Sequence, residues 1–432
     1  MAQKRVVIKR AGQLLTLAGA SKAPKRKEEM NELGLIENGA VAIEGGRILA
    51  VGTQADVEGV LDQQWGSQWH TDEEIEQIDA DGRLVMPGLV DPHTHLVFGG
   101  TREYELEMRL NGAKYLDILA AGGGILASTR MTRAASEEDL IEQSTKRLDQ
   151  FLKHGVTTVE AKSGYGLTLE DELKQLRVAK RLGEQHPVDV ISTFMGAHAI
   201  PPEYKGRSND YVDLVIEEML PIVAGENLAS FCDVFCEEGV FTIEQSERIL
   251  EAGKKVGLTP KVHADEIVAL GGAELAARVG AISADHLLRS SDEGIVAMAE
   301  AGVIAVLLPG TAFFLMAEYA RARDMIEAGV PVALSTDRNP GSSPTESLWT
   351  IMNLACLNMR MTPAEVITAA TINAAHAIGK AEEVGSLEVG KKADLLMMDA
   401  PNYPYLQYNF GVNLVDTVVK NGQVFIRGGQ RV

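Results

Sequence analysis

From residue 82 onwards, short apolar runs alternate with longer stretches whose apolar residues recur at spacings of three and four. Short apolar runs are typical of buried strands, and the longer spacing is typical of amphipathic helices. We expect strands over residues 84–91, 156–160, 188–195, 231–235, 258–263, 281–284, 303–308 and 332–335. Helices are expected between most of them, for example over residues 136–153, 168–185, 242–256 and 270–279.

Eight strands alternating with helices between residues 82 and 380 predict an α/β fold, a (β/α)8 TIM-type barrel. A doubly wound open sheet is the alternative. No G-x-G-x-x-G motif follows a first strand to support that alternative.

The two ends of the chain have a different pattern, in which short apolar runs are separated by turn residues. Before residue 82 the runs cover 6–8, 39–43 and 47–51, and after residue 380 they cover 393–398, 415–419 and 423–426. Asn421-Gly422 between the last two runs indicates a β-hairpin. We therefore predict a small β-sandwich domain built from residues 1–81 and 381–432, with the barrel of residues 82–380 inserted into it.

Composition excludes several classes of function. The chain has 432 residues and a formal net charge of −20, which argues against binding to nucleic acid or to an anionic membrane. No apolar run reaches the roughly 18 residues that a transmembrane helix needs. The three cysteines, Cys232, Cys236 and Cys356, are too few for a disulfide framework. Reduced thiols in the cytoplasm are the simpler interpretation.

The first candidate for chemistry is the stretch from Met86 to His95, an apolar run that ends in a His-x-His pair. Residues i and i+2 of a strand point to the same side, so His93 and His95 would aim both imidazoles at one point. Two neutral imidazoles are half of a metal site. His-x-His alone also occurs by chance in loops, so the other strand ends must decide.

Barrel enzymes place their chemistry at the carboxyl ends of the strands. Five of the nine histidines fall at predicted strand ends: His93, His95, His198, His263 and His286. So many histidines on one face are hard to explain by packing, because buried polar groups need partners or a function. Lys162 also lies at a strand end, where we expect a structural or surface lysine.

Three imidazoles and a carboxylate, from His93, His95, His263 and Asp337, suit Zn²⁺ or Fe²⁺ and leave room for a water molecule. A bound metal lowers the pKa of that water to about 7. Glu266, three residues after His263, can act as general base and proton shuttle. His286 can polarise a carbonyl group or hold the hydroxide.

Two features suggest the substrate. Arg102, in the loop after the first strand, is a candidate clamp for a carboxylate, although a solvated arginine is equally compatible with the sequence. Tyr165 lies between two glycines, which would let the backbone approach a ligand closely. The turn-rich loop 339–343 follows Asp337 and is placed to offer amide donors.

Together these features resemble the amidohydrolase superfamily, and most closely its imidazolonepropionase family. The resemblance covers nearly the whole chain and rests on four segments: 91–102, 162–166, 263–266 and 335–343. It implies hydrolysis of 4-imidazolone-5-propanoate to N-formimidoyl-L-glutamate by a metal-activated water. It also implies a homodimer.

The resemblance further implies roles for individual residues. The metal ligands would be His93, His95, His263 and Asp337, and the catalytic groups Glu266, His286 and Asp337. Substrate contacts would come from Arg102, Tyr115, Tyr165, His198, Glu266, Asn339, Gly341 and Ser342. Some relatives carry two metals bridged by a modified lysine after the fourth strand. Residues 235–238 contain no lysine, which favours one metal per chain.

Two alternatives remain at this stage. Another amidohydrolase, such as a deaminase of a ring amidine, would use the same metal-bound water, but a neutral base needs no clamp such as Arg102. A non-catalytic scaffold that retains the barrel should have lost metal ligands, whereas here the full set is present together with Glu266.

Overall fold

The computed structural model describes residues 4–113, 118 and 121–432. The chain divides into two compact units, each assembled from separate segments. One comprises residues 1–91, 150–158 and 347–432, and the other comprises residues 92–149 and 159–346.

Eight strands form one sheet whose order follows the sequence, which confirms the predicted barrel and excludes the open doubly wound order. The strands are β6 (Leu89–Asp91), β7 (Val156–Lys162), β8 (Asp189–Ala197), β9 (Phe231–Cys236), β10 (Thr259–Ala264), β11 (Ser283–His286), β12 (Ile304–Leu307) and β13 (Val332–Leu334). Just beyond the first and last strands, Thr94 forms a parallel bridge with Arg338. The His95 N–H also donates to the Arg338 carbonyl at 2.9 Å, so the segments that follow these two strands are joined.

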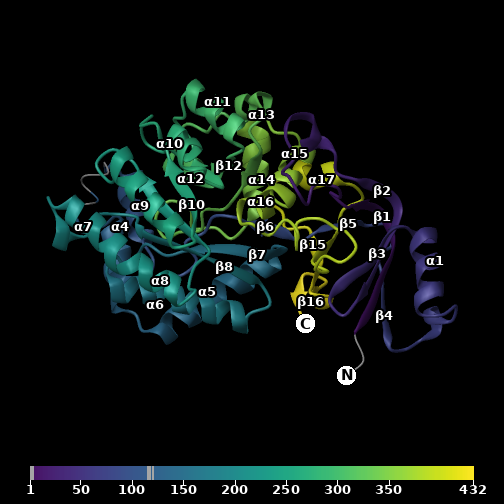
Figure 1. Ribbon diagram of the computed structural model, residues 1–432. Helices are drawn as coiled ribbons and strands as arrows, with labels where there is room; N and C mark the ends of the chain where they lie inside the picture. The colour runs from purple at the N-terminus through teal and green to yellow at the C-terminus, as the bar shows by residue number, and fades with distance from the viewer. Residues whose placement is uncertain (1–3, 114–117, 119–120) are drawn as a thin grey trace. The chain divides into compact units, whose positions relative to one another are not determined.

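Helices follow the strands and surround them (Figure 1). Those between β7 and β13 are α6 (Leu169–Gln185), α7 (Ser208–Leu214), α8 (Leu220–Gly225), α9 (Ile243–Lys255), α10 (Gly272–Val279), α11 (Asp292–Ala301), α12 (Pro309–Leu315) and α13 (Ala322–Ala328). The start of α9 shows why the sequence forms a helix there. Thr242 and Gln245 make a capping box, and Ile249 and Leu250 are buried on one side.

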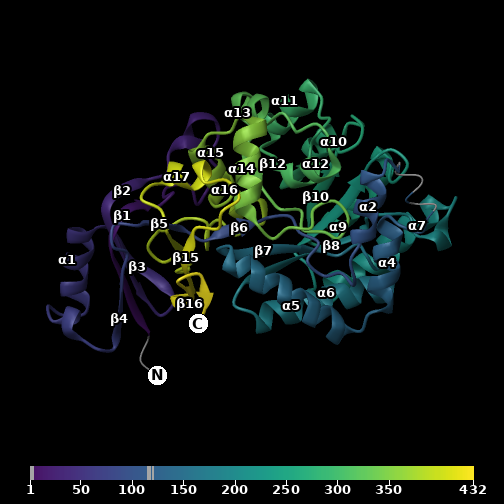
Figure 2. The ribbon, with the colours of Figure 1, turned by 180° about the vertical axis from the view of Figure 1, so that it is seen from behind.

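The connection between β6 and β7 is long and carries α2 (Glu103–Leu110), α4 (Ile125–Ala134) and α5 (Glu137–Lys153). Sequence periodicity predicted only the last of these helices. α2 and α4 lie close together (Figure 2), and the Gly124 N–H at the start of α4 donates to Glu105 of α2 at 2.7 Å. This connection contributes one side of the candidate active site.

A nine-stranded sheet combines both ends of the chain, and its purple and yellow strands lie together in Figures 1 and 2. Its strands are β1 (Arg5–Leu15), β2 (Leu35–Glu44), β3 (Arg47–Thr53), β4 (Ile75–Asp79), β5 (Leu84–Pro87), β14 (Leu395–Met398), β15 (Val415–Lys420), β16 (Gln423–Arg427) and β17 (Gln430–Arg431). Both faces are covered, because Val6 and Ile8 join one apolar cluster and Val7 joins another. The hairpin at Asn421-Gly422 is confirmed by the pairing of β15 with β16.

One local prediction is wrong, and one helix was not predicted. The single strand expected over 84–91 is divided at Gly88 into β5, in the nine-stranded sheet, and β6, in the barrel sheet. A Cβ at Gly88 would lie 2.4 Å from the Thr157 hydroxyl, so the chain changes sheets where the side chain is absent. The N-terminal segment also contains a helix, α1 (Gln54–Gln64), begun by a Thr53 cap.

The remaining helices belong to the unit that holds the nine-stranded sheet: α14 (Leu348–Met359), α15 (Pro363–Ala369), α16 (Ile372–Ala377) and α17 (Tyr403–Tyr408). Within the described part of the chain, every helix is too short or too polar to cross a membrane.

Candidate active site

The predicted metal ligands converge beyond the carboxyl ends of the barrel strands. His93 Nε2 lies 3.5 Å and His95 Nε2 3.9 Å from Asp337 Oδ1, and all three side chains are buried. The His93 and His263 ring centroids are 4.5 Å apart. Ligand atoms of His93, His263 and His286 also lie within 4.8 Å of one another. Two overlapping groups of possible metal ligands therefore share His93, one with His95 and Asp337 and the other with His263 and His286.

Hydrogen bonding shows that this group of side chains suits a metal ion. His93 Nδ1 lies 2.6 Å from Asp285 Oδ2, and His263 Nδ1 lies 3.1 Å from Asp233 Oδ2. Each carboxylate favours the tautomer with the proton on Nδ1, which leaves a lone pair on Nε2. Among the described residues, neither buried Nε2 atom has a hydrogen-bond partner. A metal between them would satisfy both atoms.

Beneath the histidines is a buried network of charges centred on Lys162. Its ammonium group lies 2.6 Å from Asp233, 3.0 Å from Glu160 and 3.2 Å from Asp285. Lys261 adds a second ammonium 2.9 Å from Glu160. Burial alone would lower the pKa of Lys162, but the carboxylates outweigh it and raise that pKa. Lys162 is thus a structural residue, fully buried rather than on the surface.

Glu266 and His286 face each other, with Glu266 Oε2 3.6 Å from His286 Nε2. Burial, followed by the negative charges of Asp337 and Glu237, raises the pKa of Glu266 to about 8. Burial also raises the pKa of Asp337 to about 6. Groups with such values can accept and return a proton near neutral pH. His286 (φ 75°) and Asp337 (φ 52°) both adopt left-handed backbone conformations, which for non-glycine residues cluster at functional sites.

Tyr165 and His198 lie beside the metal ligands. The His198 ring stacks on His95 at a centroid separation of 4.7 Å, and Tyr165 lies 5.5 Å from the same ring. A Cβ at Gly164 would come within 2.8 Å of the His198 side chain, and one at Gly166 would meet the backbone of Asp171 at 2.5 Å. These glycines therefore admit other parts of the protein, whereas the sequence suggested close approach to a ligand.

Arg102, the predicted carboxylate clamp, is already paired with Glu105. Its Nε and Nη2 each lie 2.8 Å from an oxygen of Glu105, which accounts for one edge of the guanidinium. Arg109, one helical turn further along α2, also donates to Glu105. Sequence reasoning missed both Glu105 and Arg109. The spacing 102, 105, 109 on one helix face is the signal that could have found them.

The loop after β13 is held by Asn339. The Gly341 and Ser342 N–H groups both donate to Asn339 Oδ1 at 2.8 Å, and Asn339 Nδ2 donates to the Asp337 carbonyl at 2.8 Å. The two amide donors are thus used within the loop, which fixes the backbone around Asp337. Tyr115 lies outside the described residues.

A cavity of about 600 Å³ brings these groups together. The predicted site residues that line it are His95, Arg102, Tyr165, His198, His263, Glu266, His286, Asp337, Asn339, Gly341 and Ser342. His93 is fully buried behind them. The cavity thus brings clustered histidines and carboxylates together with Arg102 and Arg109, on a scale suited to a small molecule.

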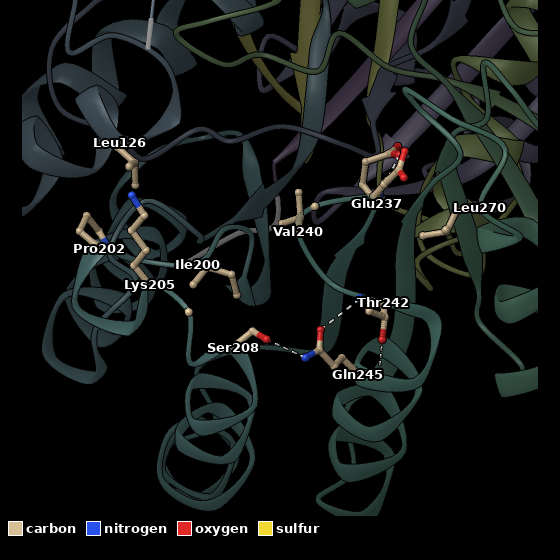
Figure 3. A pocket seen from close by; sticks show the side chains of 13 residues that line it. Leu126, Ile200, Pro202, Lys205, Ser208, Glu237, Val240, Thr242, Gln245 and Leu270 are labelled. Atoms are coloured by element: carbon tan, nitrogen blue, oxygen red, sulfur yellow. Dashed lines mark hydrogen bonds between the residues drawn. The ribbon is translucent and has the colours of Figure 1, made fainter. Parts of the chain in front are cut away.

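A second cavity of about 730 Å³ lies among the loops that follow β8 and β9 (Figure 3). Its rim is held by Gln245, which donates to Ser208 at 3.0 Å. None of the predicted site residues line it. Glu237 at its edge accepts the N–H groups of Ile267 and Val268, and so anchors the segment directly after Glu266.

Comparisons with known proteins identify the family. The model of the amidohydrolase family matches residues 84–425. An imidazolonepropionase from Shouchella clausii (strain KSM-K16) is 64% identical over 422 residues, which cover 98% of this chain and 93% of the relative. An imidazolonepropionase from Brevibacillus brevis (strain 47 / JCM 6285 / NBRC 100599) is 63% identical over 427 residues and 99% of both chains.

Solved structures show the same fold at much lower identity. A triazine hydrolase variant has a TM-score of 0.75 at 19% identity, covering 99% of this chain and 96% of its own. An adenosine deaminase from Xanthomonas campestris with bound zinc has a TM-score of 0.71 at 19% identity, covering 99% and 94%. With the full-length relatives and the matched family model, the chain belongs to the amidohydrolase family and, within it, to the imidazolonepropionases.

Proposed function

We propose that the protein hydrolyses the ring amide C–N bond of 4-imidazolone-5-propanoate to give N-formimidoyl-L-glutamate, a step in L-histidine degradation. The observation that carries the proposal is one cavity lined both by clustered histidines and by Arg102. Histidines are common metal ligands, and an arginine suits a carboxylate. Full-length relatives named imidazolonepropionase support the choice of substrate. A deaminase acting on a neutral ring amidine is less suited, because it has no use for Arg102.

We assign one divalent metal, Zn²⁺ or Fe²⁺, to His93, His95, His263 and Asp337. Bound there, it would supply a hydroxide nucleophile at neutral pH. The Nε2 atoms of His93 and His263, which have no hydrogen-bond partner among the described residues, support this donor set. Asp285 and Asp233 hold the two rings in the required tautomer.

Proton transfer is assigned to Glu266. It takes a proton as water attacks the ring carbonyl carbon, and gives a proton to the ring nitrogen as the C–N bond breaks. A pKa of about 8 lets the same carboxyl group perform both steps. His286 lies 3.6 Å from Glu266 and would donate a hydrogen bond to the oxygen that gains negative charge. Asp337 would be a second proton acceptor.

The substrate would be oriented at its two ends. Arg102 binds the propionate group, and Tyr165 and His198 flank the ring beside His95. Asn339, Gly341 and Ser342 form the wall next to Asp337. Tyr115 is retained as a further candidate contact. We also propose that the protein forms a homodimer and that it lies in the cytoplasm. The three free cysteines agree with the cytoplasmic location.

The test is turnover of 4-imidazolone-5-propanoate by the purified protein, followed as loss of ultraviolet absorbance, with metal analysis of the same sample. We expect turnover with about one metal per chain. A metal-loaded protein that leaves this substrate intact but hydrolyses another cyclic amide would overturn the assignment. Gel filtration with light scattering tests the dimer independently.

A further inference from the structure

We propose that Arg109 is a second specificity-determining arginine of the carboxylate subsite, and that Glu105 is the positioning residue for both arginines. The inference rests on the proposed function and deepens it. It explains how the protein selects a substrate with a single short acidic tail, through one side chain at the N-cap of α2 and two within the helix.

The geometry of α2 brings the three side chains together. Arg102 precedes the helix as its N-cap residue, and Glu105 and Arg109 follow at intervals of three and four. Arg102 and Arg109 both line the cavity that contains the metal ligands. Glu105 lies behind them, with 1% of its surface exposed.

The charges show why Arg102 is insufficient alone. Its bidentate contact with Glu105 makes a neutral pair, and a second carboxylate approaching a neutral pair gains little Coulomb energy. Arg109 restores the missing charge. Two guanidinium groups and one carboxylate leave one net positive charge, which matches a ligand with one carboxylate.

Glu105 is built to hold this arrangement. Besides both arginines, it accepts the Gly124 N–H at 2.7 Å, so both of its oxygens are engaged. Gly123 packs against it so closely that a Cβ there would lie 2.8 Å from a Glu105 oxygen. A buried carboxylate with this many donors fixes the direction of each guanidinium.

Arg109 is held from two further sides. Its Nη1 donates to the Gly341 carbonyl at 3.2 Å, and its guanidinium lies 5.8 Å from the Phe314 ring centroid. The first contact connects α2 to the loop that follows Asp337, and the second connects it to α12. The position of the substrate's tail is therefore set relative to the catalytic groups by direct hydrogen bonds.

The experiment uses calorimetry to measure the binding of two probes to the metal-loaded protein. The probes are imidazole-4-propanoate and its primary amide, which share the imidazole ring and differ only in the charge of the tail. The dissociation constant of the amide divided by that of the acid reports how strongly the site prefers a carboxylate. We expect Arg109→Met to reduce that ratio by about 10- to 100-fold, as loss of a charge-assisted contact does. Arg109→Lys should retain most of the preference. Arg177→Met, which removes an exposed arginine paired with Glu226, should leave it unchanged.

Each outcome decides between the inference and the proposed function. If wild type prefers the acid and Arg109→Met preserves that preference, the inference is wrong while the proposed function stands. If wild type shows no preference for the acid, the proposed substrate fails and the inference fails with it. Retained binding of the amide shows that the variant's cavity is intact, so a misfolded variant cannot imitate the expected result.

Discussion

Two of the metal-facing histidines are oriented in the same way. His93 and His263 each direct Nδ1 at a buried aspartate and leave Nε2 without a partner among the described residues. Burial is the largest cause that lowers the pKa of His93 well below its usual range, so this imidazole stays neutral and able to bind a metal. The surroundings of the two rings thus leave each Nε2 atom oriented as the proposed metal site requires.

The role of Glu266 is testable by a substitution that preserves its size. Glu266→Gln removes the proton acceptor, and we expect kcat to fall by about 10²- to 10⁴-fold. Metal content and binding of the imidazole-4-propanoate probe should remain close to wild type. Glu238→Gln, at an exposed position after β9, is the control. Unchanged turnover in Glu266→Gln would remove the glutamate from the mechanism.

Gly341 tests the wall of the acid site. A Cβ at this position would lie 2.4 Å from Arg102 Nη1, so Gly341→Ala must displace the guanidinium. We expect about a tenfold higher KM with little change in kcat, because the lost contact serves the bound substrate and transition state alike. Gly59→Ala in α1, where a Cβ meets nothing within 4 Å, is the matched control. An unaltered KM in Gly341→Ala would show that Arg102 does not bind the tail.

Sequence reasoning found the residues that follow strands and missed those that support them. His93, His263 and Asp337 were predictable because chemistry in a barrel gathers at strand ends. Asp233 lies within β9, where one polar residue among apolar neighbours does not reveal its partner. Its pairing with His263 depends on the register of β9 against β10, which only the folded structure supplies.

At the scale of elements, the inward-facing charges of neighbouring strands must balance one another. Lys162 of β7 contacts Asp233 of β9 and Asp285 of β11, so one ammonium spans three strands. Removing it would leave buried carboxylates without compensation. The network therefore contributes to the stability of the barrel as well as to the orientation of the histidines.

Lys162→Met tests this network. We expect the free energy of unfolding to fall by about 3 to 5 kcal/mol, the usual cost of breaking a buried ion pair from one side. Urea unfolding followed by circular dichroism measures the change. Lys146→Met, which removes an exposed ion pair with Glu142, should cost no more than about 0.5 kcal/mol. Equal effects of the two substitutions would contradict a structural role for the network.

Glu388 makes a comparable connection in the unit with the nine-stranded sheet. It accepts from Ser386 and, across the length of the chain, from Ser21 at 2.8 Å and the Gly19 N–H at 3.2 Å. Burial raises its pKa, but these hydrogen bonds and Lys391 outweigh burial and lower that pKa to about 2. The ionised carboxylate therefore joins the two chain ends.

The lowered pKa of Glu388 gives a pH dependence of known sign. A carboxylate with a depressed folded-state pKa stabilises fully above its unfolded value of about 4.5, and loses that contribution as pH falls towards 2. We expect Glu388→Gln to lower the free energy of unfolding by about 1 to 2 kcal/mol at pH 7, allowing for partial exposure. Urea titrations at pH 7, 4 and 3 should show this difference shrinking. A constant difference would show that ionisation is not its source.

The elements themselves were predicted unevenly. The barrel strands from β7 onwards and α5, α6, α9 and α10 were expected close to their observed positions, because strong periodicity marks them. α2 and α4 were not predicted, because the connection that contains them has polar residues facing the cavity and no regular apolar pattern. The domain boundaries at residues 81 and 381 stay a prediction.

At the scale of the whole molecule, metal binding and folding should be coupled. Buried imidazole nitrogens that lack a hydrogen-bond partner among the described residues cost free energy in the apoprotein, and a ligand that binds only the folded state stabilises it by mass action. We expect chelation to abolish turnover and lower the melting temperature, and one equivalent of Zn²⁺ or Fe²⁺ to restore both. In His93→Ala, chelation should leave the melting temperature unchanged. Full activity of metal-free protein would contradict the assigned centre.

The insertion after β6 has a consequence for how such enzymes diversify. Arg102, Glu105 and Arg109 come from the N-cap and the body of a single short helix, whereas the proposed hydrolytic groups come from several strand ends. If the proposed roles hold, the arginines for the tail and the groups for bond cleavage are encoded in separate stretches of the gene. Exchanging one helix would redirect an unchanged hydrolytic apparatus to compounds with a different appendage, a modest evolutionary step compared with rebuilding the catalytic centre.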